Sequence, residues 1–220
     1  MNRKIKAPDI AESVFDIGYL TFDLIAGIVF LINASGRTLF LLYGILTLIL
    51  GIGDGFHLIP RVIKALKGTD EKVKVMLGKG LEVSSITMTV FYVILMYIWK
   101  YTFNLEVPAI IFVLVWLSAI ARIIICLLPQ NNWCGNGNMK LSLLRNSVFL
   151  ITGAGIITLY IISGNANNYH LYRMAIAITI SFACYIPVTL LSKKKPMIGM
   201  LMIPKTCAYI WMIVMGLELL

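Results

Sequence analysis

Seven runs of about 20 mostly apolar residues follow one another along this chain of 220 residues, with short polar turns between them. Inside a bilayer only an α-helix or a closed barrel satisfies all of its own backbone hydrogen bonds. We therefore expect residues 1–220 to form a single transmembrane domain, an all-α polytopic bundle of seven helices in the cell membrane. The spans are expected near residues 14–33, 38–60, 81–99, 107–128, 146–163, 171–191 and 197–217.

Lysine and arginine are unevenly shared between the two sides that seven spans define. One side carries Arg3, Lys4, Lys6, Arg61, Lys64, Lys67, Lys72, Lys74, Lys79, Lys140, Arg145, Lys193, Lys194 and Lys195, and the other carries Arg37, Lys100 and Arg173. Short cytoplasmic loops are the ones enriched in basic residues, so the N-terminus is expected in the cytoplasm and the C-terminus outside. The formal charge of +9 is then explained by orientation rather than by binding to nucleic acid.

Ionisable residues also occur within the expected spans, where charge is costly and usually faces the bundle interior or a wet cavity. They are Asp16, Asp23, Asp54, His57, Glu82, Arg122 and Lys205. At a rise of about 1.5 Å per residue, all of them fall in the cytoplasmic half of the bilayer. This predicts a polar cavity that opens to the cytosol or inner leaflet and is closed on the outer side by apolar packing.

Helical spacing groups several of these residues on shared faces. Asp54, His57 and Arg61 are three and four residues apart, which places them in one stripe. A second stripe on the following helix includes Glu82 and Tyr92. A purely structural interpretation stays open, in which the internal acids and bases are buried ion pairs that fix helix order, while the shallow ones, Asp16, His57 and Glu82, are simply wet.

The segment Gly-Asp-Gly-Phe-His-Leu-Ile-Pro-Arg at residues 53–61 resembles the second-helix signature of the lysoplasmalogenase-like family. In that family a Gly-Asp pair precedes a helix with a glycine and a closing His-x-x-Tyr. The next helix here has Gly80 and a motif that ends at Tyr92, with Thr89 in the place of the histidine. The resemblance covers roughly residues 45–95, and the family's late Ser-Asp motif is not found.

The resemblance implies hydrolysis of the vinyl-ether bond of a lysophospholipid-type membrane lipid by paired acids, with Asp23 or Glu82 in place of the missing second acid. Such a reaction needs a group that gives a proton and a base that activates water. The hypothesis assigns catalysis to Asp54, Glu82, His57 and Asp23, and substrate binding to Arg61, Arg122, Lys205 and Tyr92. No cofactor is expected, and no metal either, because the spans offer one histidine and scattered acids.

Three other functions stay open on the sequence. A transporter or proton-coupled carrier would use Asp23, Asp54, His57 and Glu82 as a relay, although no inverted repeat is evident. A retinal protein is suggested by seven helices with Lys205 in the last one. A non-catalytic assembly or signalling partner would need none of these groups. The sequence does not fix the oligomeric state.

Overall fold

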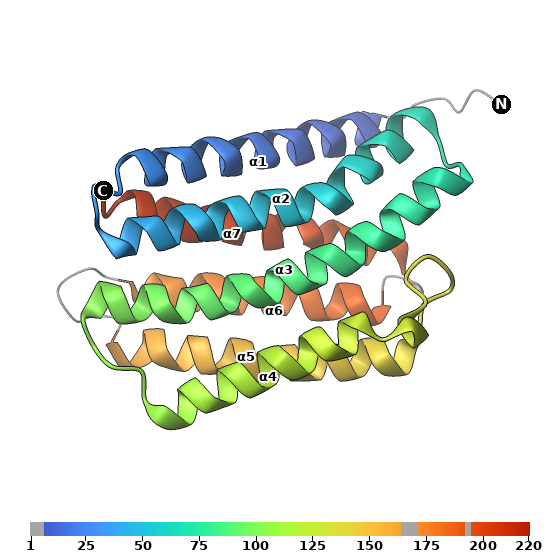
Figure 1. The fold of residues 1–220 in the computed structure, drawn as a ribbon. Helices are drawn as coiled ribbons and strands as arrows, with labels where there is room; N and C mark the ends of the chain where they lie inside the picture. Colours follow the sequence, from blue (N-terminus) through green and yellow to red (C-terminus); the bar gives the residue numbers. More distant parts are fainter. Residues whose placement is uncertain (1–6, 164–170, 192–194) are drawn as a thin grey trace.

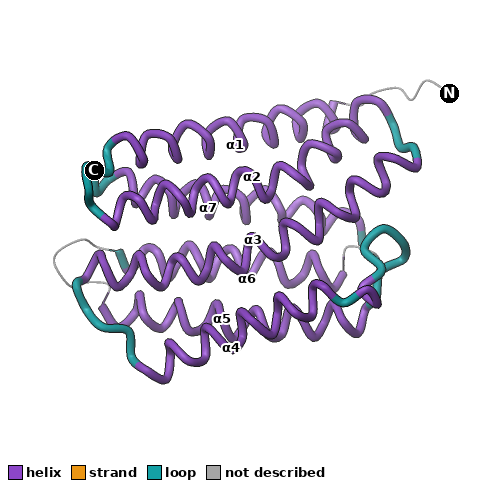
Figure 2. Tube along the Cα trace, in the orientation of Figure 1, coloured by secondary structure: helices purple, strands orange, loops and turns teal. Residues whose placement is uncertain are grey.

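The computed structural model describes residues 7–163, 171–191 and 195–220, and this part of the chain contains no strand. Figures 1 and 2 show long helices that run side by side. They are α1 (Ala7–Ile32), α2 (Thr38–Lys67), α3 (Glu71–Phe103), α4 (Ala109–Leu127), α5 (Met139–Ser163), α6 (Tyr172–Leu191) and α7 (Met202–Leu217), with short 3₁₀ helices η1 (Pro129–Asn131) and η3 (Pro196–Leu201). Seven helices are long and apolar enough to span a membrane, which confirms the expected all-α seven-helix bundle and a multi-pass membrane protein.

Consecutive helices pack against one another and the chain closes on itself. Helix α1 packs on α2 and α2 on α3, the pairs α4–α5, α5–α6 and α6–α7 follow, and α7 returns to α1 and α2. Figure 1 places the start of α1, the turn between α2 and α3 and the segment between α4 and α5 at one end, and the C-terminus and the turn between α1 and α2 at the other. We call these the N-terminal end and the C-terminal end of the bundle.

Helices α2 and α3 extend beyond the expected apolar spans at the N-terminal end. Helix α2 continues through Pro60 and ends at Lys67, where Gly68 takes a φ of 95°. Helix α3 begins about three turns before residue 81 because the Asp70 carboxylate caps it, accepting a hydrogen bond of 2.7 Å from the Val73 amide. The two extensions carry many of the basic residues that set the expected orientation. Of the residues in that count, Arg3, Lys4, Lys6, Lys193 and Lys194 lie outside the described residues.

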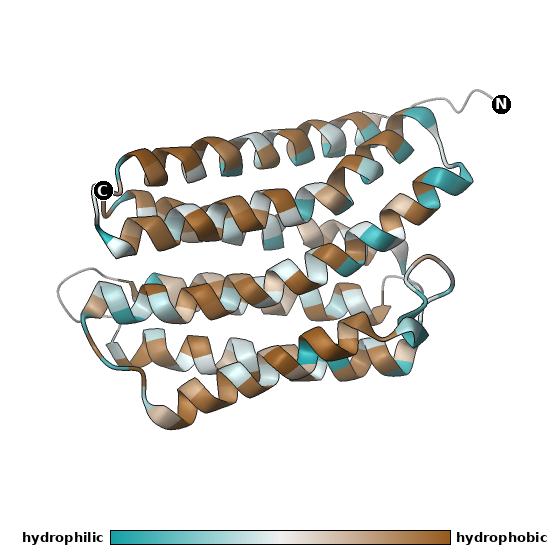
Figure 3. Cartoon of the chain, in the orientation of Figure 1, coloured by the Kyte–Doolittle hydropathy of each residue, from teal (hydrophilic) through white to brown (hydrophobic). Residues whose placement is uncertain are grey.

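Apolar side chains cover the outside of the bundle, and aromatic rings fill its C-terminal half. Figure 3 shows hydrophobic residues, in brown, along every helix and hydrophilic residues, in teal, at the turn between α2 and α3. Inside, Phe30 stacks on Tyr43 with ring centroids 5.1 Å apart, and Trp99 packs on Phe103 at 5.9 Å. All four side chains are almost completely buried. The interior of the C-terminal half is therefore packed with apolar aromatic side chains.

Glycines let α2 and α3 approach closely near the polar half of the bundle. A Cβ atom at Gly80 would collide with the Phe56 carbonyl oxygen and lie 2.8 Å from the His57 Cα. A backbone atom cannot move aside as a flexible side chain can. We expect Gly80→Ala to lower stability by about 1–3 kcal/mol through overpacking, measured as the thermal midpoint in detergent. Gly18→Ala on α1, where nothing lies within 4 Å, is the matched control and should leave the midpoint unchanged or raise it.

The direction in which the bundle crosses the membrane is a second prediction. We expect a tag at the N-terminus to be accessible from the cytosol and a tag at the C-terminus from the opposite side, because the basic turns lie at the N-terminal end. Protease or impermeant-label accessibility in intact and opened vesicles measures this. Both tags on one side would contradict the seven-span topology.

Candidate functional site

A cavity of about 430 Å³ lies at the N-terminal end of the bundle, among helices α1 to α7 and the segment between α4 and α5. Its wall is polar for an intramembrane space. The ionisable side chains that line it, tyrosines aside, are Asp16, Asp54, His57, Arg61, Arg122, Arg145 and Lys205. The cavity therefore collects residues from five different helices, and most of the charged residues that the sequence places inside the spans lie in it.

Asp54 is held in a fixed position in the wall of the cavity by two hydroxyl groups. The Ser84 hydroxyl on α3 donates to Oδ1 at 2.6 Å, and the Tyr19 hydroxyl on α1 donates to Oδ2 at 3.1 Å. The Asp54 residue is only 9% exposed, and α1, α2 and α3 meet at its carboxylate. The bond from Ser84 has the short length of a strong hydrogen bond to a carboxylate. The carboxyl group is therefore preorganised, with little freedom to rotate.

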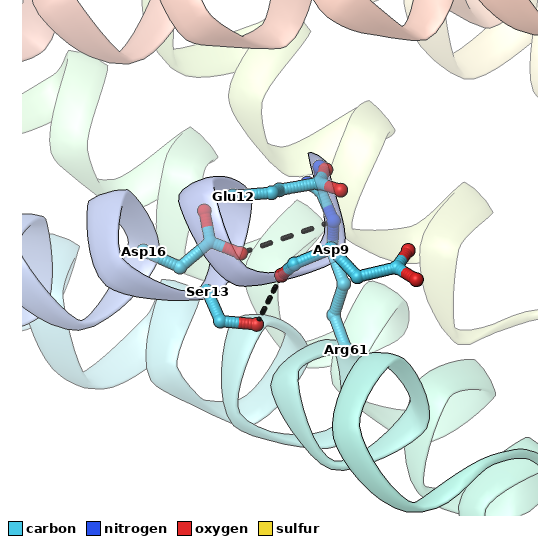
Figure 4. Close-up of polar contacts among 5 residues, drawn as sticks. All are labelled: Asp9, Glu12, Ser13, Asp16 and Arg61. Atoms are coloured by element: carbon cyan, nitrogen blue, oxygen red, sulfur yellow. Dashed lines mark hydrogen bonds and ion pairs between the residues drawn. The ribbon is translucent and has the colours of Figure 1, made fainter. Parts of the chain in front are cut away.

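A second carboxylate, Asp16 on α1, lines the cavity near Asp54. Figure 4 shows Arg61 reaching from α2 toward the carboxylates of α1. Arg61 forms an ion pair with Glu12, and its Nε lies 3.9 Å from Asp16 Oδ2. Asp16 is buried and lines the same cavity as Asp54. The cavity thus has a pair of acids, although the sequence suggested Asp23 or Glu82 as the second one.

Arg122 on α4 is a buried cation that forms no ion pair with any carboxylate of the described residues. It is 1% exposed, its Nη1 donates to Thr89 Oγ1 at 2.9 Å, and its guanidinium carbon lies 3.4 Å from the centre of the Phe149 ring. Its Nε has no hydrogen-bond partner among the described residues. A buried charge is expensive unless it is paired. An anion in the cavity would supply the missing partner.

Lys205 on α7 presents a second buried cation to the same space. It is 7% exposed, and its ammonium lies 4.6 Å from the ring centre of Tyr209 and 5.7 Å from that of Tyr185. None of the described residues forms an ion pair with it at contact distance, and Asp54 lines the same cavity. Aromatic faces stabilise a cation but leave it able to accept an anion.

Arg145 on α5 is a third cation of the cavity, and the segment between α4 and α5 positions it. Its Nη1 donates to Asn131 Oδ1 at 2.8 Å, and its guanidinium carbon lies 4.1 Å from the Trp133 ring centre. The Asn131 amide in turn donates to the Cys126 and Leu128 carbonyls that end α4. The sequence analysis counted Arg145 only among the basic residues of one side, and no signal in the sequence places it in this cavity.

Three of the predicted site residues lie outside the cavity lining. Asp23 is fully buried between α1 and α2, about 10 Å further along α1 than Asp16. Glu82 is half-buried on α3 and does not reach the cavity. Tyr92 is fully buried with its ring 5.0 Å from that of Phe149. The structure brings together Asp54, His57, Arg61, Arg122 and Lys205 from the predicted set and adds Asp16 and Arg145.

The donor set of the cavity suits an anion better than a metal ion. In the described part of the chain, no three histidine, cysteine, aspartate or glutamate side chains converge as metal ligands would. Comparisons of the chain with family models, with curated proteins and with solved structures find no match. Fold and site together define a multi-pass α-helical membrane protein with a cationic intramembrane cavity that contains a preorganised acid.

Proposed function

We propose that the protein is a membrane-embedded hydrolase of anionic single-chain lipids, of the lysophospholipid type that the lysoplasmalogenase-like resemblance implies. One observation carries the proposal: a preorganised acid, Asp54, shares a cavity with two buried cations, Arg122 and Lys205, that form no ion pair with a carboxylate in the described part of the chain. A binding site without reactive groups would not need the acid. A structural ion-pair network would not leave Arg122 unbalanced.

The cations account for recognition of the lipid phosphate. Arg122 and Lys205 are almost completely buried, so their attraction to an anion is little weakened by water. Guanidinium groups also match the geometry of phosphate oxygens. A volume of about 430 Å³ falls in the usual range of ligand pockets and suits a headgroup with its glycerol linkage. The lipid chain would extend into the bilayer.

The two acids account for the chemistry. For a vinyl ether, Asp54 gives a proton to the alkenyl carbon, and water attacks the carbon that bears oxygen while Asp16 takes the proton of that water. The hemiacetal so formed breaks into a fatty aldehyde and a glycerophosphoester whose glycerol hydroxyl is now free. His57 lines the same cavity and can relay a proton between water and the acids.

The proposal is tested by incubating the purified protein with a mixture of ester, ether and vinyl-ether lysophospholipids, followed by lipid mass spectrometry. We expect one linkage class to disappear with the wild type and to persist with Asp54→Asn. A matched mixture with uncharged headgroups should react slowly, because the cations then have no ligand. Well-folded protein that turns over no lipid would contradict the hydrolase and favour an anion carrier, which flux into proteoliposomes would detect.

A further inference from the structure

Five aromatic rings line the cavity, and cationic side chains of the protein lie against four of them. The five rings belong to Phe15, Trp133, Phe149, Tyr185 and Tyr209. Arg122 lies over the Phe149 ring and Arg145 over the Trp133 ring. The Lys205 ammonium lies against the rings of Tyr185 and Tyr209. Among the described residues, no cation lies over Phe15. The aromatic faces of the wall are therefore largely occupied by positive charge.

A quaternary ammonium headgroup such as choline finds no suitable site in the described part of this wall. Proteins hold such cations in cages of several aromatic faces, and Phe15 alone does not make one. The other four faces already carry a protein cation, which would repel a second positive charge. The carboxylates do not replace a cage. Asp54 accepts hydroxyl hydrogen bonds at both oxygens, and Asp16 faces Arg61, with 3.9 Å between Oδ2 and Nε.

Two of these cations lie on adjoining parts of the wall. The rings of Phe149 and Tyr185 are neighbours, with centres 6.1 Å apart, and they carry Arg122 and Lys205 respectively. The Tyr185 hydroxyl donates to Asn146 Oδ1 at 2.9 Å, which holds this ring in place. Cations from α4 and α7 therefore come together on a fixed aromatic surface.

The charge balance of the cavity favours a doubly charged ligand. Among the described residues, no carboxylate forms an ion pair with Arg122, Arg145 or Lys205. A phosphomonoester carries a charge of about −1.5 to −2 at neutral pH. A phosphocholine headgroup has no net charge, because its phosphodiester anion and its ammonium cancel. Only the phosphomonoester would balance more than one of these cations without adding a positive charge.

We infer that the cavity selects single-chain lipids with a phosphomonoester headgroup and rejects those whose phosphate carries choline. Lys205 has two roles in this selection, because its ammonium attracts the phosphate and also occupies the faces of Tyr185 and Tyr209 that would otherwise be open to a ligand cation. The inference deepens the proposed function, and its meaning as a substrate preference rests on that function. The preference in binding does not depend on turnover and is measured separately.

The preference is tested by calorimetric titration of the whole protein in an uncharged detergent with dodecyl phosphate, dodecylphosphocholine and inorganic phosphate. We expect dodecyl phosphate to bind at least about 10-fold more tightly than either of the others. Equal or tighter binding of dodecylphosphocholine would overturn the inference. Equal binding of inorganic phosphate would also overturn it, because the site would then take a free anion. Selective binding of dodecyl phosphate by a protein that hydrolyses no lipid would contradict only the proposed function.

The role of Lys205 is tested with Lys205→Ala, which removes the charge and leaves the faces of Tyr185 and Tyr209 open to the cavity. Dodecyl phosphate should bind about 10-fold more weakly and dodecylphosphocholine more tightly than to the wild type. Lys205→Arg keeps the cation and should keep the preference.

The matched control is Lys100→Ala, because Lys100 lies in the last turn of α3 at the C-terminal end of the bundle, paired with Glu106. It should change neither affinity. Thermal midpoints show whether each variant is folded. Equal weakening of both ligands in folded Lys205→Ala would contradict a selecting role for Lys205, since a residue that only supports the shape of the cavity would affect both ligands alike.

Discussion

Replacing Asp54 with asparagine is expected to lower the kcat for lipid hydrolysis by about 10²–10⁴-fold, the usual contribution of a positioned proton donor. The amide has nearly the same shape and can still accept a hydrogen bond from Ser84 or Tyr19, so the three helices that meet there should stay together. It cannot give up a proton to the substrate. Product formation followed by mass spectrometry under saturating lipid measures the change.

Ser84→Ala is the matched control for this prediction. It removes the 2.6 Å hydrogen bond to Asp54 Oδ1 but leaves the acid in place, so a fall of only about 10-fold is expected. Thermal midpoints of both variants should remain close to that of the wild type. Full activity of folded Asp54→Asn would exclude Asp54 as the proton donor. Equal losses in both variants would mean that position, rather than proton transfer, limits the rate.

Replacing Arg122 with methionine is expected to have effects of opposite sign on binding and on stability. Binding of an anionic alkyl phosphate should weaken by about 100-fold, because loss of one buried charge partner costs at least about 2–3 kcal/mol. Stability without ligand should rise, because an apolar side chain of similar length replaces a buried charge that pairs with no carboxylate among the residues that the structure describes. Calorimetric titration and the thermal midpoint measure the two effects.

The opposite signs separate a binding residue from a structural one. If Arg122 fixed helix order through an ion pair, the methionine variant would lose stability and binding together. Arg37→Met is the matched control, because Arg37 also lies over an aromatic ring, 4.1 Å from the centre of Phe40, but at the C-terminal end of the bundle. It should leave phosphate binding unchanged. Weakened binding in Arg37→Met would place the anion site elsewhere.

The helical architecture could be predicted because it depends on local composition. Each run of about 20 apolar residues must form a helix to satisfy its backbone in lipid. The depth of a charged residue also follows from its position along the helix, which is why Asp54, His57 and Arg122 were expected in the same half of the bilayer. The start of α3 was harder to predict, because polar capping by Asp70 extends this helix beyond its apolar span.

The sequence by itself determined a bundle of seven apolar helices with its charges gathered toward one end. Hydropathy sets where each helix lies, and the rise per residue sets the depth of each charge, and both depend only on the residues of that segment. Only the tertiary structure decided which charges share the cavity. Asp16 and Asp23 lie on one face of α1, but the cavity reaches Asp16, whereas Asp23 is enclosed against Gly51. Arg145 lines the cavity because the segment between α4 and α5 folds back onto α5. Which side chains reach the cavity depends on how each helix is rotated and packed against its neighbours. That rotation and packing are decided by contacts between distant parts of the chain.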